Sequence, residues 1–331
     1  MLGFADYNGH SAPALPDGFL IKSIPRLQSL ELRSILFPSL PKLLLFATDF
    51  VRLTLVGILQ TGYLPPEAIV TGLAVLANLT SLTIGFESPL SHPGRTSRSI
   101  LPPTRTVLPV LTYFEFRGSS EYLEDLVTQI NTPLLDSIQI TFFHQLMFDI
   151  RQLSQLMRRT TRLEVLNEAH VDFDYTGVQI GSFPPTLTFD EKSGLKISCR
   201  AYDWRLPYLV RVITSFFPSI YMVERLYIYE SSYLASQYQD SVENNMQLLE
   251  HLCPFTAVKN LYISREFAKC IALVPQELVE EEVTNMLPTL KSIFLEDPQP
   301  SGPTQESIKQ FFAARQHLGH PVAISHWKKE R

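Results

Sequence analysis

The sequence predicts an α/β fold: a solenoid of about ten irregular repeats, with a curved parallel sheet on its concave side and helices on its convex side. Three observations predict this class. A hexamer of the pattern L-x-x-L-x-L recurs at intervals of about 23 to 35 residues. Apolar residues between the hexamers follow the helical period. Finally, 45% of the 331 residues are hydrophobic and 18% are charged, which is enough apolar material for a large core.

The hexamers predict the strands. In the first, "LQSLEL", Leu27, Leu30 and Leu32 occupy the apolar positions. The other clear hexamers place apolar residues at Phe50, Leu53 and Leu55; Leu79, Leu82 and Ile84; Leu111, Phe114 and Phe116; Leu135, Ile138 and Ile140; Val223, Leu226 and Ile228; Val258, Leu261 and Ile263; and Leu290, Ile293 and Leu295. Two further hexamers are weaker, because one ends in Glu168 and the other begins with Lys192. We expect the apolar side chains to face the core.

The segments between the hexamers predict helices. After Ser120, a helical apolar face contains Tyr122, Leu123, Leu126, Val127 and Ile130. Similar faces occur at Ile150, Leu153, Leu156 and Met157; at Leu209, Val210, Val212, Ile213, Phe216 and Phe217; and at Leu278, Val279, Val283 and Leu287. "LPPEAI" at residues 64–69 is expected to begin another helix. Strands that alternate with helices imply a parallel sheet with helices on one side.

The chain divides into three expected regions. Residues 1–20 offer no convincing helix to cap the first repeat, residues 21–298 carry the solenoid, and residues 299–331 form a linker and a capping helix with a tail. In that helix, Ile308, Phe311 and Phe312 are expected to face inward. Residues 88–107 are rich in Pro, Ser and Arg, so we expect a surface loop there. A phosphorylated or partner-binding loop is the alternative.

Composition restricts the function classes. The net charge of −5 gives no electrostatic case for binding nucleic acid or an anionic membrane. Asp49 and Arg52 interrupt the most apolar stretch, and residues 1–20 lack the pattern of a signal peptide. Three widely spaced cysteines without a C-x-x-C pair favour a reducing compartment. We therefore expect a monomer in the cytoplasm or the nucleus.

No combination of residues predicts catalysis or metal binding. Two S-x-x-K matches, at Ser39 with Lys42 and at Ser193 with Lys196, are short enough to arise by chance. His317, His320 and His326 are close in sequence, but no Cys or carboxylate has ligand-like spacing with them. The pair Asp172 and Asp174 is read as solvated. We expect no cofactor and no metal.

One row of residues is a candidate binding surface. Strand alternation sends the fifth residue of each hexamer to the face opposite the core. This row contains Glu31, Thr54, Thr83, Glu115, Gln139, Lys196, Tyr227, Tyr262 and Phe294, and it changes from polar to aromatic along the chain. Tyr and Arg often carry binding energy at interfaces. With neighbours on the same strands, the predicted partner-binding residues are Tyr113, Glu115, Arg117, Arg225, Tyr227, Tyr229, Tyr262, Arg265 and Phe294. Alternatively, these aromatics pack against a loop or the terminal helix, or merely favour strands.

Three long runs resemble a fungal F-box/leucine-rich-repeat family. They are "LPVLTYFEFRGSSEYLEDLVTQINTPLLDSIQITFFHQLMFDIRQL", "CPFTAVKNLYISREFA" and "LPTLKSIFLEDPQPSGPTQESIKQFFAARQHLGHPVAIS". The resemblance implies a leucine-rich-repeat solenoid and, where an F-box precedes it, a substrate receptor of an SCF-type ubiquitin ligase. Only about 20 residues precede the first repeat, whereas an F-box needs a longer helical module, so we expect no F-box in this chain. No asparagine follows the early strands, which departs from the usual repeat.

These observations favour a non-enzymatic protein-interaction module. Its partner would be a protein target, with an SCF adaptor only if an F-box lies upstream. One alternative is a truncated or degenerate family member without independent activity. Another is an enzyme whose site is assembled from residues scattered along the sequence.

Overall fold

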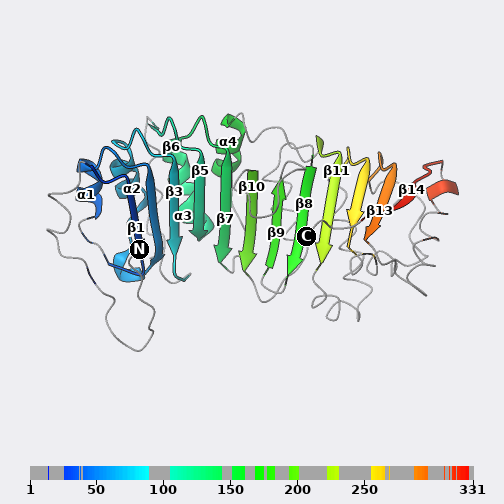
Figure 1. Ribbon diagram of the computed structural model, residues 1–331, viewed down its shortest axis with the longest axis horizontal. Helices are drawn as coiled ribbons and strands as arrows, with labels where there is room; N and C mark the ends of the chain where they lie inside the picture. Colours follow the sequence, from blue (N-terminus) through cyan, green and yellow to red (C-terminus); the bar gives the residue numbers. More distant parts are fainter. Residues whose placement is uncertain are drawn as a thin grey trace, which may run out of the picture. The chain divides into compact units, whose positions relative to one another are not determined.

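The computed structural model describes residues 14, 26–36, 38, 40–88, 105–143, 151–160, 168–174, 177–182, 194–200, 222–230, 255–264, 268, 287–296, 309, 313, 315–317 and 319–327. The chain forms two compact units. Unit 1 comprises Met1–Glu164 and Lys192–Lys196, and unit 2 comprises Val165–Glu191 and Ile197–Arg331. Figure 1 shows the strands and helices of both units. The single solenoid expected over residues 21–298 stays a prediction.

Unit 1 contains a parallel sheet. Its strands are β1 (Ser29–Arg33), β2 (Arg52–Ile58), β3 (Ser81–Phe86), β5 (Tyr113–Gly118) and β7 (Ser137–Phe143), and they lie in that order. A separate pair joins β4 (Thr106–Val107) to β6 (Ile130–Asn131). Residues 106 and 107 are therefore a strand, which corrects the predicted loop at its end, and residues 89–104 lie outside the described residues.

Helices follow β1, β2, β5 and β7, as the alternation predicted. They are α1 (Leu40–Phe46), α2 (Pro66–Leu73), α3 (Ser120–Gln129) and α4 (Arg151–Arg159), with a short 3-10 turn, η2 (Gln60–Gly62). Consecutive helices contact each other, α1 with α2, α2 with α3 and α3 with α4. The α2 helix begins at Pro66, where a missing N–H costs no helical hydrogen bond. This confirms that "LPPEAI" starts a helix.

The predicted apolar positions form the core of both units. At the first, fourth and sixth positions of the clear hexamers, every described side chain is buried except Leu27, which is partly exposed. The fourth positions lie in register across unit 1 as Leu30, Leu53, Leu82, Phe114 and Ile138. The apolar pattern in the sequence therefore predicted correctly which face of each strand is turned toward the core.

Neighbouring repeats are also linked just before each strand. The carbonyl of Val51 accepts hydrogen bonds from the N–H groups of Thr80 and Ser81, and the carbonyl of Thr80 accepts from Thr112 and Tyr113. The hydroxyls of Thr80 and Thr112 donate to the same two carbonyls, at 3.1 and 3.2 Å. These threonines satisfy buried backbone groups without the usual asparagine.

Unit 2 contains β8 (Glu168–Asp174), β9 (Gly177–Ser182), β11 (Arg225–Glu230), β12 (Asn260–Ile263), β13 (Ser292–Glu296) and β14 (Ala323–Trp327). Their order is β9-β8-β11-β12-β13-β14, and all neighbours are parallel except β8 and β9. The strand β10 (Gly194–Arg200) is divided between the two units. The antiparallel pair corrects the expectation of a purely parallel sheet.

The weak hexamer at residues 163–168 gave the wrong register. Its last residue, Glu168, opens β8 on the same face as Tyr227, and the neighbouring Ala169 occupies the core-facing position; both residues are buried. The helix predicted around residues 209–217, most of the helix predicted over residues 278–287, and Ile308, Phe311 and Phe312, which were expected to face inward, lie outside the described residues. Leu287, at the end of the second predicted helix, is buried but lies in a bend and not in a helix. Within the described parts of the chain, no helix has the length and hydropathy to cross a membrane.

A carboxylate from α3 caps the start of α4. The two oxygens of Glu124 accept hydrogen bonds from the backbone N–H groups of Gln152 and Leu153, at 2.8 and 2.9 Å. The first N–H groups of a helix have no partner within the helix, and the helix dipole favours negative charge there. Glu124 therefore joins two consecutive helices.

Replacing Glu124 with alanine is expected to lower the free energy of unfolding by about 1–2 kcal/mol, because the first turn of α4 loses two charge-assisted hydrogen bonds. Urea unfolding followed by circular dichroism measures this loss. Glu121→Ala on the same helix is the control, since Glu121 is exposed, and it should cost less than about 1 kcal/mol. Equal losses from the two variants would contradict the capping role.

Candidate partner-binding surface

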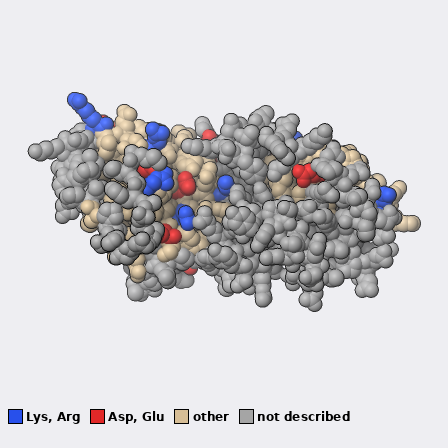
Figure 2. Space-filling model, turned by 60° about the horizontal axis from the view of Figure 1, so that its bottom comes forward, with Lys and Arg blue, Asp and Glu red and all other residues tan. Residues whose placement is uncertain are grey.

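The residues predicted for the open face of unit 1 lie side by side. Glu31, Thr54, Thr83, Glu115 and Gln139 occupy matching positions on neighbouring strands. The strands also carry Arg33, Arg52 and Arg117. Figure 2 shows basic and acidic side chains close together in the left half of the view. This face of unit 1 is therefore polar.

The predicted residues of unit 1 contact each other or nearby strands. The hydroxyl of Tyr113 donates to Glu115 Oε2 at 2.9 Å. Burial of the Tyr113 phenol, together with the nearby charge of Glu115, raises its pKa. The guanidinium of Arg117 lies over the ring of Phe143, 5.5 Å from its centre, in a cation–π contact. The structure thus brings Tyr113 and Glu115 together, and it places the side chain of Arg117 from β5 against Phe143 of β7.

Unit 2 carries a stack of aromatic rings on its open face. We call His170, Tyr227, Tyr262 and Phe294 the aromatic row; they come from β8, β11, β12 and β13 at matching positions. Successive ring centres are 4.3, 4.2 and 4.4 Å apart, and their planes differ by 3°, 11° and 9°. Each ring is partly exposed. The strand pairing therefore builds a ladder of stacked rings whose edges face outward.

Two further aromatic residues extend this cluster. Tyr229 is two residues beyond Tyr227 on the same face, and it is buried with its hydroxyl 3.5 Å from His170 Nδ1. Trp327, from the last strand, lies edge-on to Tyr227 and Tyr262, with ring centres 6.1 and 5.7 Å apart. Edge-to-face contacts of this kind are favourable. Trp327 consequently packs across the aromatic row.

An ion pair supports the start of the aromatic row. The guanidinium of Arg225 binds the carboxylate of Glu168, whose side chain is only 4% exposed. Burial raises the pKa of Glu168, and the adjacent positive charge of Arg225 opposes that shift. His170 Nε2 lies 4.0 Å from the same carboxylate. Burial and the neighbouring Glu168 also raise the pKa of the Tyr227 phenol, which keeps this ring neutral.

The structure therefore assembles part of the predicted set. Arg225, Tyr227, Tyr229, Tyr262 and Phe294 lie together on unit 2, although Tyr229 is buried and not exposed. Arg265 lies outside the described residues. The sequence analysis missed Glu168, His170 and Trp327. The rings contact one another, and the alternative that they pack against a loop or the terminal helix stays open.

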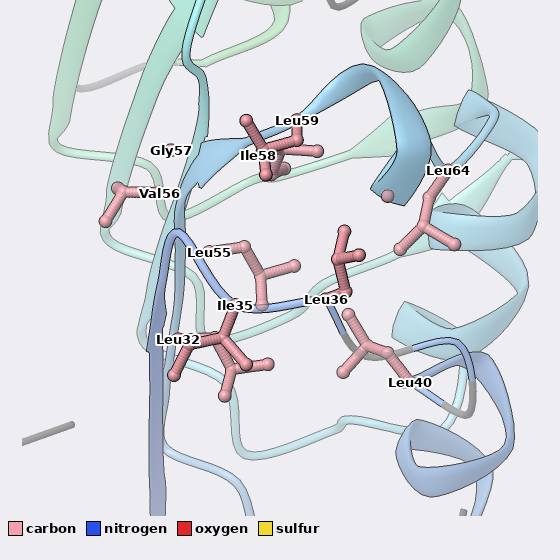
Figure 3. Close-up of a pocket in the computed structure, with 11 residues that line it drawn as sticks. Leu32, Ile35, Leu36, Leu40, Leu55, Val56, Gly57, Ile58, Leu59 and Leu64 are labelled. Atoms are coloured by element: carbon pink, nitrogen blue, oxygen red, sulfur yellow. The ribbon is translucent and has the colours of Figure 1, made fainter. Parts of the chain in front are cut away.

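The described residues contain no cluster of metal ligands. Among them, no three His, Cys, Asp or Glu side chains lie close enough to hold a metal ion. A pocket in unit 1 is lined only by apolar residues and glycines, and Figure 3 shows Leu36, Leu40, Leu55 and Leu64 around it. Such a lining supplies no proton donor or nucleophile.

Gly57 shapes one wall of this pocket. Its φ of +68° favours glycine, and a Cβ there would clash with Ser34 Oγ. The register between β2 and β3 shifts between Leu55 and Ile58, which indicates a bulge at this glycine. The residues of this bulge, Val56 to Ile58, line the pocket.

Comparison with known proteins shows a distant likeness to a solved structure. No protein-family model matches the chain, and a search of curated proteins gave no match. Among solved structures, the chain is similar to the leucine-rich repeat-containing protein LegL7 from Legionella pneumophila. The two are 14% identical, the match covers 93% of this chain and 86% of that chain, and the TM-score is 0.33.

Proposed function

We propose that this chain is a non-enzymatic, leucine-rich-repeat-type module that binds a protein target through the aromatic row of unit 2. One observation carries the proposal: four rings on four neighbouring strands stack in register and remain partly exposed. A rigid row of Tyr and Phe loses little side-chain entropy on binding, so it suits an interface. Arg225 and Glu168 add charged groups at its edge.

The repeat architecture in this proposal has independent support. The apolar positions of the L-x-x-L-x-L hexamers are buried on parallel strands in both units. In unit 2 the ring centres are 4.2–4.4 Å apart, less than the usual spacing of about 4.8 Å between strands. Side chains come closer together than their strands on the inner side of a bend, which favours a sheet curved toward the aromatic row.

A narrower proposal follows from the resemblance to F-box/leucine-rich-repeat proteins. In that view the module selects the target of an SCF-type ubiquitin ligase, and an F-box supplies the adaptor contact. Joining an F-box to the chain should then shorten the half-life of the bound target in cells. The same fusion carrying a damaged aromatic row should leave that half-life unchanged.

Replacing Tyr227 and Tyr262 together with alanine is expected to reduce target capture by about ten-fold or more, because two central rings of the binding surface are lost. Quantitative affinity purification of tagged wild-type and variant chains, followed by mass spectrometry, measures this ratio. The loss of stacking should also lower stability by about 1–2 kcal/mol. Circular dichroism at the assay temperature shows that the variant stays folded.

The control is Phe46→Ala, because Phe46 is an aromatic side chain on α1 that is 67% exposed. It should leave capture of the same target unchanged. If Phe46→Ala reduces capture as strongly as the double variant, the captured protein adheres to exposed aromatics and the proposal is wrong. Full capture by the folded double variant would also contradict it.

A further inference from the structure

The aromatic row stops one strand before the sheet of unit 2 stops. The strands β8, β11, β12 and β13 each contribute one ring. The last strand in the order, β14, has Ser325 at the matching position beside Phe294. Phe294 and Ser325 are both partly exposed. One face of Phe294 is stacked on Tyr262, so its other face is directed toward the position above Ser325.

The spacing of the aromatic row sets where a further planar group would stack. Successive rings of the row are separated by 4.2–4.4 Å, so one more planar group over β14 would continue the series. Trp327 follows on the same face of β14, but its ring packs on Tyr227, Tyr229 and Tyr262 instead. A serine side chain is too small to fill the position of a ring.

A carboxylate lies next to this position. Glu296 is two residues beyond Phe294 on the same face of β13, and it is partly exposed. Residues two apart on a strand are about 7 Å apart, within reach of a guanidinium stacked on Phe294. Glu296 already interacts within the chain, and a carboxylate with two oxygens accepts several hydrogen bonds. Glu296 therefore places a carboxylate beside the position above Ser325.

We propose that the position above Ser325 receives an arginine side chain of the protein target, whose guanidinium stacks on Phe294 and donates hydrogen bonds to Glu296. The inference rests on the proposed function and names the chemistry of its partner. Arginine combines a planar group that stacks on rings with a fork of donors that matches a carboxylate. A lysine lacks the plane, and a proline or phenyl ring would cover Glu296 without bonding to it.

The test uses the peptide acetyl-Gly-Gly-Arg-Gly-Gly-amide and the full chain with Trp204→Phe, which leaves Trp327 as the single tryptophan of the two in the sequence. The indole N–H signal of Trp327 is followed by two-dimensional NMR as peptide is added. A saturable shift in the millimolar range is expected. The same peptide with citrulline, which keeps the shape and removes the charge, should bind about ten-fold more weakly.

Two matched variants test whether the peptide binds above Ser325. Ser325→Phe fills the position with a ring of the chain itself and should abolish the shift while the melting temperature stays equal or rises. His326→Phe adds the same ring to the opposite face of β14, where His326 is exposed, and should bind the peptide as before. Should Ser325→Phe fail to fold, Glu296→Gln gives the decision, with an expected loss of about ten-fold.

Three results would overturn the inference: no saturable shift with the arginine peptide, equal binding of the citrulline peptide, or full binding by folded Ser325→Phe. These results are separable from the proposed function. A chain that loses its target through Tyr227→Ala with Tyr262→Ala, and keeps it in Ser325→Phe, retains the binding module and refutes the arginine site.

Discussion

Replacing Arg225 with methionine is expected to lower the free energy of unfolding by about 3 kcal/mol at neutral pH. Methionine keeps much of the apolar stem of Arg225 but removes the charge that faces Glu168. The carboxylate of Glu168 is only 4% exposed, so water cannot replace the lost partner. Urea unfolding of wild type and variant, followed by circular dichroism, measures the difference.

The loss should depend on pH in a defined direction. Burial raises the pKa of Glu168 in the folded chain, so folding favours the protonated carboxyl, and this stabilisation disappears as pH rises through the folded pKa. Without Arg225 the pKa rises further, because the charge that opposed the shift is gone. The difference between wild type and Arg225→Met should therefore be small near pH 4 and reach its full value by about pH 8.

Two further variants test the cause. Lys259, just before β12, and Glu224, just before β11, also form an ion pair, but both side chains are more than 40% exposed. Lys259→Met is the matched control and should cost less than about 1 kcal/mol. Adding Glu168→Gln to Arg225→Met should recover most of the stability, since no buried charge remains. A loss independent of pH, or no recovery in the double variant, would refute the role given to this pair.

The apolar strand positions could be predicted because they depend on local alternation. A residue such as Leu82 or Leu261 is buried because its strand has one face toward the core, and the neighbours in sequence reveal that face. The same alternation placed Tyr227, Tyr262 and Phe294 on the open face. What the pattern could not give is that these rings stack on one another, because stacking depends on the register between strands that are distant in sequence.

Glu168, His170 and Trp327 could not be predicted from the sequence, for physical reasons. Glu168 occupies a position where an apolar residue was expected, because it is paired with Arg225 from another strand. Because Glu168 was assigned to the core face, His170, two residues later, was not assigned to the open face. Trp327 lies on the last strand, where Ile324 and His326 are exposed and no apolar alternation marks the strand. A strand at a sheet edge has fewer buried contacts, so its sequence is less constrained.

The hairpin of β8 and β9 was missed for a different reason. The sequence analysis assumed that each strand is followed by a helix, whereas Asp174 and Gly177 are paired across a short reversal. Repeat spacing alone cannot distinguish a helical connection from a hairpin when the hexamer at that place is irregular. The repeat pattern therefore predicts the core with more certainty than it predicts every connection.

The second large effect is expected at Tyr122, on α3 of unit 1. Its side chain is 1% exposed, and its hydroxyl donates to the carbonyl of Leu64 at 2.9 Å. The ring lies edge-on to Phe86 at 4.7 Å and stacked with Phe116 at 6.0 Å. Tyr122 therefore connects α3 to the ends of β3 and β5 and to the segment before α2.

Tyr122→Ala should lower the free energy of unfolding by about 4 kcal/mol, because it leaves a cavity between these elements. Tyr122→Phe keeps the ring and removes only the hydroxyl, so it should cost about 1 kcal/mol. Burial raises the pKa of Tyr122, so above about pH 10 the unfolded chain ionises first and stability falls as pH rises. The phenylalanine variant should lose this alkaline contribution, which urea unfolding at neutral and alkaline pH would reveal. Equal losses in the two variants would mean that the hydrogen bond to Leu64, and not the ring, holds these repeats together.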